Sequence, residues 1–162
     1  MKIAIAQINA TIGDFEGNRE RILSFARRGK EQGAELVLFP ELSLCGYPPM
    51  DLLDHNAFVE ENRKSLRLLQ QELPGDIAVA LGYVDVNREM AGKALQNSVA
   101  ILKGGEVIFR QAKTLLPTYD VFDEARYFEP AKSREVVEIG DERVGIAICE
   151  DIWWEREPAP GT

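Results

Sequence analysis

The interpretation of the fold depends on the stretch Val144-Gly145-Ile146-Ala147-Ile148-Cys149-Glu150-Asp151-Ile152-Trp153-Trp154. An apolar run ends here at a cysteine, and two carboxylates follow at once. Such a run predicts a buried strand that stops at Cys149. In open α/β sheets, ligands and nucleophiles lie at the carboxyl ends of strands. Cys149 is therefore a candidate nucleophile, although free cysteine is also among the residue types most often buried and inert.

The N-terminal part of the chain predicts a strand, a helix and a second strand. Residues 2–8 form an apolar, β-branched run that is typical of a buried strand. A helix is expected to begin at the N-cap Asn18 and to end at Gly33, which can take the left-handed conformation that closes helices. Residues 34–39 resume the strand pattern, and Glu41 follows its end. This order indicates an α/β fold with two parallel strands.

The rest of the chain predicts one more helix and several antiparallel strands. Residues 42–49 form an irregular apolar loop, and the helical pattern that follows ends at Pro74-Gly75. His55, just before that helix, is expected to be a surface or capping residue. The sequence then predicts five strands, with turns at Gly104-Gly105 and Gly140-Asp141, over residues 77–86, 95–102, 107–109, 135–139 and 143–148.

Composition excludes several classes of protein. The 162 residues make one domain, with a core of useful size. A formal net charge of −8 with no basic stripe argues against nucleic-acid and anionic-membrane partners. No apolar run has the length of a signal-peptide core or a membrane span, so we expect a cytoplasmic protein. Two cysteines and one histidine make a disulfide framework or a metal site improbable.

A thiol nucleophile needs a base or a positive neighbour, because its ordinary pKa is about 8.5. A Cys–His pair would require His55, which is placed before a helix and far from the strand ends. Glu41 could instead take the thiol proton, and Lys113 could stabilise an oxyanion together with the backbone N–H after Cys149. Each residue also has an ordinary explanation, as a solvated loop acid, a surface lysine or a buried cysteine. Lys113 lies in a long irregular segment, 111–128, of a kind that is usually functional.

Three blocks of sequence resemble the signatures of the nitrilase superfamily of carbon–nitrogen hydrolases, in the same chain order. They are Phe39-Pro40-Glu41, Lys113-Thr114-Leu115-Leu116-Pro117 and Cys149-Glu150-Asp151-Ile152-Trp153. Two further blocks, 46–53 and 119–128, are similar to the glutaminase domains of glutamine-dependent NAD synthetases. The resemblance extends from Met1 to the end of the chain.

The resemblance implies a fold and a catalytic triad. The fold would be an α-β-β-α sandwich, of which the chain holds the N-terminal portion. Glu41 would be the general base and acid, Lys113 the oxyanion stabiliser and Cys149 the nucleophile.

The resemblance also implies roles for three supporting residues. Glu124 would orient Lys113, although a loop salt bridge with Arg126 is the ordinary alternative. Tyr47 and Tyr119 would line the substrate pocket, and simple packing is the alternative for both.

The implied reaction is hydrolysis of the glutamine side-chain amide through a cysteine thioester. The ammonia would pass to a synthetase domain that amidates nicotinic acid adenine dinucleotide with ATP. Residues 1–162 are expected to be an incomplete hydrolase domain in a homo-oligomer, with the synthetase domain absent. No cofactor is expected in this domain, because ATP and Mg belong to the synthetase domain. Two alternatives remain open, a catalytically idle or partner-binding fragment and another amidase of the same superfamily.

Overall fold

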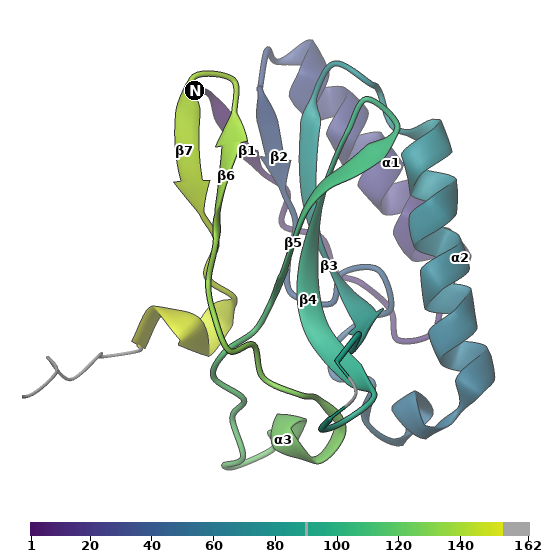
Figure 1. Ribbon diagram of the computed structural model, residues 1–162. Helices are drawn as coiled ribbons and strands as arrows, with labels where there is room; N and C mark the ends of the chain where they lie inside the picture. The colour runs from purple at the N-terminus through teal and green to yellow at the C-terminus, as the bar shows by residue number, and fades with distance from the viewer. Residues whose placement is uncertain (90, 154–162) are drawn as a thin grey trace, which may run out of the picture.

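A five-stranded mixed sheet forms the centre of the computed structural model (Figure 1), which describes residues 1–89 and 91–153. The first three strands in the sheet run parallel, and the last two join in antiparallel pairs. In spatial order they are β1 (Ile3–Ile5), β2 (Leu36–Leu38), β3 (Ala78–Val86), β4 (Leu95–Lys103) and β5 (Glu106–Ala112). The predicted parallel βαβ unit and the antiparallel strands after it are confirmed.

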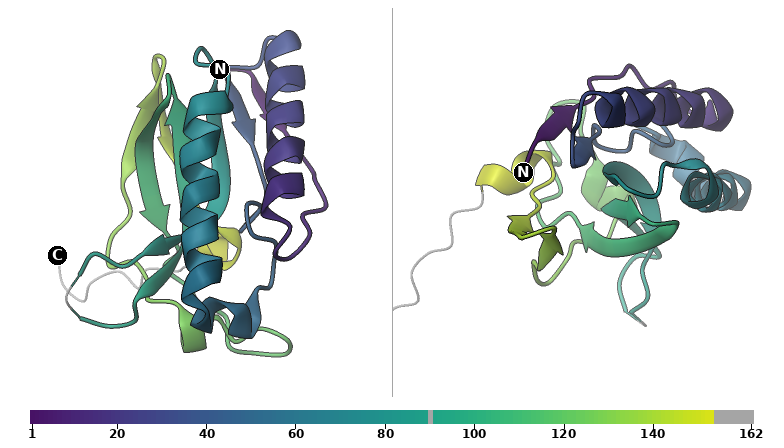
Figure 2. Two further views of the ribbon diagram at one scale, coloured as in Figure 1. Left: turned by 90° about the vertical axis from the view of Figure 1, so that its right-hand side faces the viewer. Right: turned by 90° about the horizontal axis from the view of Figure 1, so that it is seen from above.

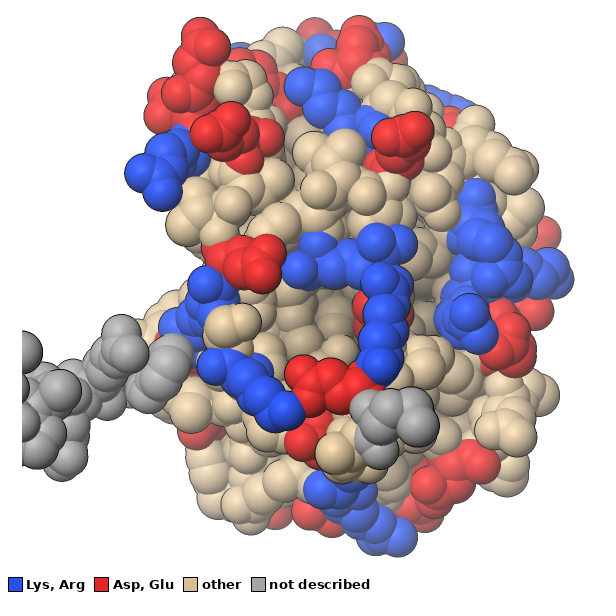
Figure 3. Space-filling view, in the orientation of Figure 1, with Lys and Arg blue, Asp and Glu red and all other residues tan. Residues whose placement is uncertain are grey.

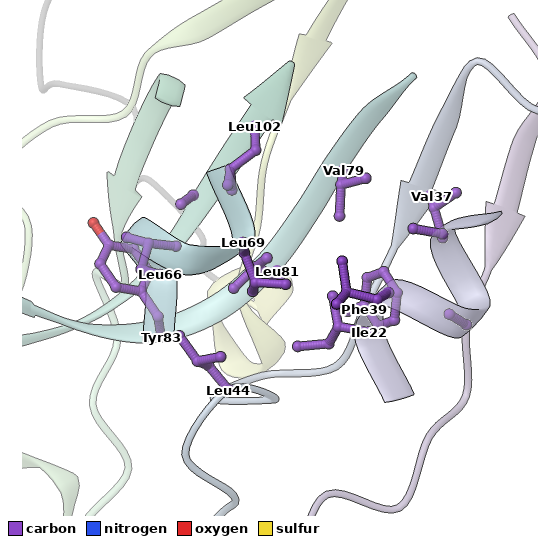
Figure 4. Packing of buried hydrophobic residues seen from close by; sticks show 14 of the residues in the cluster. Ile22, Val37, Phe39, Leu44, Leu66, Leu69, Val79, Leu81, Tyr83 and Leu102 are labelled. Carbon is purple, nitrogen blue, oxygen red and sulfur yellow. The ribbon is translucent and has the colours of Figure 1, made fainter. Parts of the chain in front are cut away.

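Two long helices, α1 (Phe15–Glu31) and α2 (Asn56–Glu72), lie side by side on one face of this sheet (Figure 2). Their apolar stripes and the facing side chains of β2, β3 and β4 form the largest core cluster (Figure 4). Fully burying one such leucine or isoleucine side chain stabilises the fold by about 1.5–3 kcal/mol. No helix in the described part of the chain combines the length and apolar character of a membrane span.

The first helix begins earlier than the sequence suggested, so the prediction that Asn18 is its N-cap is wrong. Asp14 caps α1, because its Oδ1 accepts a hydrogen bond from the Gly17 backbone N–H at 3.0 Å. Asn18 is buried inside the first turn, where its Nδ2 donates to Thr11 O at 2.8 Å and to Leu44 O at 3.2 Å. Asn18 therefore joins two loops to the helix by hydrogen bonds and does not cap its N-terminus. The prediction for Gly33 is confirmed by its φ of +74°.

The turn between β4 and β5 forms where the sequence predicted it. Gly104 and Gly105 have φ values of +62° and +81°, and Lys103 pairs with Glu106 across them. Two successive positive φ values define the tight hairpin turn that suits the twist of antiparallel strands, and glycine adopts them without steric cost.

A second sheet covers the opposite face. Strands β6 (Val136–Ile139) and β7 (Glu142–Gly145) form an antiparallel hairpin. Val137 and Ile139 pack with residues of the large sheet that point away from the helices. The described residues thus form three layers in the order helices, sheet, sheet, which are three of the four layers that were expected (Figure 2).

The strand predicted over residues 143–148 is shorter than expected. The ladder stops where Gly145 pairs with Val136, the first residue of β6. The preceding residue, Glu135, leaves the hairpin, because its backbone N–H donates to Gln111 Oε1 at 3.0 Å. Residues 146–148 therefore have no strand partner in the described part of the chain, and Cys149 begins the short 3₁₀ helix η2 (Cys149–Trp153).

Two short helical segments complete the described elements, η1 (Met50–Asp54) and α3 (Glu124–Tyr127). The latter lies in the long segment that was predicted to be irregular. Trp154 and the predicted domain end at residue 162 lie outside the described residues.

Candidate active site

Glu41 lies in the loop that follows β2, where the path of the backbone is tightly confined. The residue after it, Leu42, has a φ of +46°, a conformation that L residues rarely adopt. The loop crosses β3 at Gly82, where an added Cβ would lie 2.2 Å from Leu42 N and 2.8 Å from the Glu41 carbonyl carbon. The missing side chain of Gly82 therefore allows the Glu41 backbone to approach the sheet.

Lys113 directly follows β5, and its side chain is completely buried. Its Nζ donates to Glu41 Oε1 at 2.7 Å and to Glu124 Oε1 at 2.9 Å. Burial opposes the charged form of the lysine, but the hydrogen bonds and charges of the two carboxylates outweigh it and raise the pKa of Lys113. The ammonium group is thus held charged between two acids.

Glu124 is buried at the start of α3 and does not pair with Arg126, which lies near Asp51 instead. Besides Lys113, Glu124 Oε1 accepts a hydrogen bond from Tyr47 Oη at 2.8 Å. Burial and then the charge of the nearby Glu41 raise the pKa of Glu124, whereas Lys113 and Tyr47 act in the opposite direction.

Asn97 is a member of this cluster that the sequence reasoning missed. Its Nδ2 donates to Glu41 Oε1 at 2.6 Å and to Glu124 Oε2 at 3.2 Å, and its backbone O accepts from Lys113 N at 2.8 Å. The Oδ1 of Asn97 is buried without a partner in the described structure. A signal was present, because asparagine is uncommon inside a buried strand.

Cys149 has a φ of +50° and an exposed side chain. It lines a cavity of about 200 Å³, whose wall also includes Glu41, Gly82, Ser98 and residues 146–148. Backbone strain of this kind in a non-glycine residue is typical of functional sites. The face of the molecule that carries the β6–β7 hairpin is hollowed near its centre, and basic and acidic side chains gather around the hollow (Figure 3).

The thiol and the charged cluster affect each other electrostatically. Although Cys149 is exposed as a residue, partial burial of its thiol raises the pKa, the negative charge of Glu41 raises it further, and Lys113 and the Glu150 backbone N–H oppose the change. A thiol in this environment stays protonated at neutral pH and needs a base to form the thiolate. Glu41 lines the same cavity as Cys149, and its charge acts on the thiol, so it is the carboxylate placed to take that proton.

Both tyrosines pack against Phe122. The Tyr47 and Phe122 ring centroids are 6.3 Å apart, and those of Tyr119 and Phe122 are 5.7 Å apart. Tyr119 is half exposed and donates to Glu150 Oε2 at 3.0 Å. Neither tyrosine is part of the wall of the Cys149 cavity, so the structure places them beside the nucleophile but outside that cavity.

The other candidate groups are separate from the cluster. Cys45 is buried, and burial raises the pKa of its thiol to about 12 against the effect of its own backbone. His55 is exposed before α2, where its side chain makes no cap hydrogen bond. In residues 1–89 and 91–153, no group of three or more His, Cys, Asp or Glu side chains is arranged to hold a metal ion.

The fold and this cluster coincide with a match to the carbon–nitrogen hydrolase family over residues 2–159. The chain therefore belongs to that family, and it has the fold of the N-terminal portion of the nitrilase-type sandwich.

The relatives that share this fold include glutamine-dependent NAD synthetases and amidases. The glutamine-dependent NAD(+) synthetase of Thermotoga maritima is 41% identical over 160 residues, which cover 98% of this chain and 27% of that protein. A structure of the glutamine-dependent NAD+ synthetase of Acinetobacter baumannii in complex with ADP matches 93% of this chain and 28% of that chain, with 36% identity and a TM-score of 0.86. An amidase from Nesterenkonia matches 95% and 57% of the two chains, with 26% identity and a TM-score of 0.78. The chain thus spans little more than a quarter of the synthetases it matches.

Proposed function

We propose that this chain is the glutaminase part of a glutamine-dependent NAD synthetase, with Cys149 as nucleophile, Glu41 as general base and acid, and Lys113 as oxyanion stabiliser. The observation that carries the proposal is the position of Lys113 Nζ, 2.7 Å from Glu41 Oε1, beside a strained cysteine in a cavity. Similarity to the synthetases, over nearly the whole of this chain, supports glutamine as the substrate.

In the first half of the reaction, Glu41 takes the Sγ proton of Cys149, and the thiolate attacks the amide carbon of glutamine. The carbonyl oxygen becomes an oxyanion, which the Lys113 ammonium and the backbone N–H after Cys149 stabilise. The C–N bond then breaks, Glu41 returns the proton to the leaving nitrogen, and ammonia departs from a thioester. Lys113 and Asn97 both bind Oε1 of Glu41, an arrangement that keeps Oε2 available for these transfers.

In the second half, Glu41 takes a proton from water, and the hydroxide attacks the thioester carbon. The C–S bond breaks, the thiol regains its proton, and glutamate leaves. A variant of the Nesterenkonia amidase carries the acetamide moiety of fluoroacetamide covalently at its active-site cysteine, which supports a nucleophilic cysteine here. The ammonia would be used by a synthetase domain that binds ATP and Mg, and the whole protein would be a cytoplasmic homo-oligomer. The glutaminase domain formed by this chain would need no cofactor.

Covalent trapping tests the proposal. The whole gene product is incubated with a glutamine analogue that carries an electrophilic ketone at the amide position, and the modified peptide is located by mass spectrometry. We expect one adduct, on Cys149, and protection by glutamine. Protection by short aliphatic amides but not by glutamine would indicate an amidase of another specificity. An unmodified Cys149 would indicate an idle domain.

A further inference from the structure

Asp151 is a buried carboxylate that connects the Cys149 turn to the segment that begins with Lys113. Its Oδ1 accepts hydrogen bonds from the Thr114 backbone N–H at 2.9 Å, the Thr114 hydroxyl at 2.6 Å and the next backbone N–H at 2.8 Å. Its Oδ2 accepts from the Ile148 backbone N–H at 3.2 Å. Thr114 directly follows Lys113, and Ile148 directly precedes Cys149. One carboxylate therefore fixes the backbone next to both residues.

The same residue closes the turn that holds the nucleophile. The Asp151 backbone N–H donates to Ile148 O at 3.1 Å, while the Asp151 carboxylate accepts from the Ile148 N–H. This reciprocal pair resembles the capping box, in which an acidic side chain in the first turn reaches back to the residue before the helix. Cys149 lies between Ile148 and Asp151 and has a positive φ, which residues other than glycine rarely adopt. Asp151 thus holds the backbone on either side of the strained residue.

Arg134 reinforces this connection from the segment before β6. Its Nη2 lies 3.3 Å from Asp151 Oδ1 and donates to Asp151 O at 3.1 Å. Its Nε donates to the Thr114 hydroxyl at 2.9 Å. A buried charge is stable only when it is paired and its acceptor sites are filled, and both conditions are met here.

We infer that Asp151 is a positioning residue, which sets the place of the Cys149 sulfur relative to Lys113 and Glu41 by fastening the nucleophile turn to the lysine segment. Asp151 itself need not touch the substrate. A displacement of about 1 Å in such a site can lower turnover about 10²-fold. The inference rests on the proposed function only where turnover of glutamine is measured.

The test replaces Asp151 with asparagine in the whole gene product. Asp151→Asn keeps the size of the side chain but puts an NH₂ group against backbone donors and removes the charge that faces Arg134. We expect turnover of glutamine to fall about 10²-fold, with KM changed far less. We also expect the pKa of the Cys149 thiol, measured from iodoacetamide alkylation against pH, to fall towards its ordinary value. Burial and the charge of Glu41 raise it now, and a released turn loses both effects.

Asp85→Asn is the matched control. Asp85 is also a mostly buried carboxylate, with a hydrogen bond from Tyr83 Oη at 2.5 Å and an ion pair with Arg110, and it is not part of the cavity wall. The Asp85→Asn variant should lose some stability, but its Cys149 thiol should titrate as in the parent protein and its turnover should be unchanged. If Asp151→Asn does not fold, Thr114→Val removes one donor to the carboxylate and should show the same changes to a smaller degree, whereas Thr114→Ser should restore both.

The thiol titration separates this inference from the proposed function, because alkylation needs no substrate. If glutamine is not the substrate, turnover of glutamine is absent in every variant, but the shift in the titration of Asp151→Asn is still expected. A parent-like titration in both Asp151→Asn and Thr114→Val, with turnover no lower than in Asp85→Asn, would overturn the inference.

Discussion

Lys113 Nζ and Glu41 Oε1 lie 2.7 Å apart although 72 residues separate them in the sequence. The two side chains meet because β2 and β5 belong to one sheet and run in the same direction, so the segments that follow them leave the sheet at the same end. An ion pair placed there, with a completely buried lysine, provides a positive charge next to a base. This relationship determines several expected outcomes.

Lys113→Met should abolish most turnover in a protein that still folds, although its stability should fall because the buried Glu124 loses its charged partner. Removing one oxyanion donor typically lowers kcat by about 10²–10³-fold, whereas an exposed lysine contributes almost nothing. Steady-state glutamate release measures the effect, and circular dichroism checks the fold. Lys103→Met, at the end of β4, is the control and should behave as the parent protein does. Near-normal rates in Lys113→Met would exclude the assigned role.

Glu41→Gln should separate thiol reactivity from turnover. The negative charge of Glu41 helps to raise the pKa of the Cys149 thiol, so its removal should lower that pKa. At a fixed pH below the parent's thiol pKa, a larger fraction of Cys149 is then thiolate, and alkylation by iodoacetamide should be faster. Glutamine hydrolysis should nevertheless be lost, because no base remains to transfer the protons. Slower alkylation in Glu41→Gln would contradict the electrostatic argument.

Glu124→Gln should weaken both the position of Lys113 and the stability of the site. The buried carboxylate accepts hydrogen bonds from Lys113, Tyr47 and Asn97, and an amide cannot replace all three. We expect a loss of about 1–3 kcal/mol in the free energy of unfolding, together with lower turnover. Tyr47→Phe removes only one of these bonds, so urea denaturation should show a smaller loss. Equal stabilities for Glu124→Gln and the parent would show that the cluster has no such role.

Gly82→Ala should damage catalysis through the backbone. The new Cβ would collide with the backbone of residues 40–42, which cannot move as a flexible side chain can. Overpacking of this kind costs about 1–3 kcal/mol, and Glu41 would be displaced. Gly145→Ala is the matched control in a strand, because an added Cβ there meets no atom within 4 Å. Thermal unfolding and turnover should both fall in the first variant and remain unchanged in the second. Unchanged turnover in Gly82→Ala, with a loss in Gly145→Ala, would show that Gly82 does not position the Glu41 backbone.

Local patterns were sufficient to predict most of the fold. The spacing of apolar residues predicted the two long helices and the strands of the large sheet. Gly33 and Gly104 ended elements as expected, because only glycine adopts a positive φ freely. The start of α1 was missed because Asp14 and Asn18 are equally good N-caps by type. Only the tertiary contacts of Asn18 decide between them.

The end of the strand before Cys149 could not be predicted, because it depends on a partner elsewhere in the chain. Residues 146–148 have a strand pattern, but β6 begins too late to pair with them. The triad residues were chosen from motifs, and the structure brings them together. Asn97 could be noticed only as an unusual residue type in a buried strand. Its partners, like the connecting role of Asp151, depend on contacts between distant segments.

The most direct test compares the two cysteines in the whole gene product. Cys149→Ala should abolish glutamine-dependent NAD formation yet leave ammonia-dependent formation intact, because added ammonia bypasses the thiol. Cys45→Ala should keep both activities, since its thiol is buried and its pKa is raised to about 12. Full glutamine-dependent activity in Cys149→Ala, or its loss in Cys45→Ala alone, would show that the nucleophile has been assigned to the wrong residue.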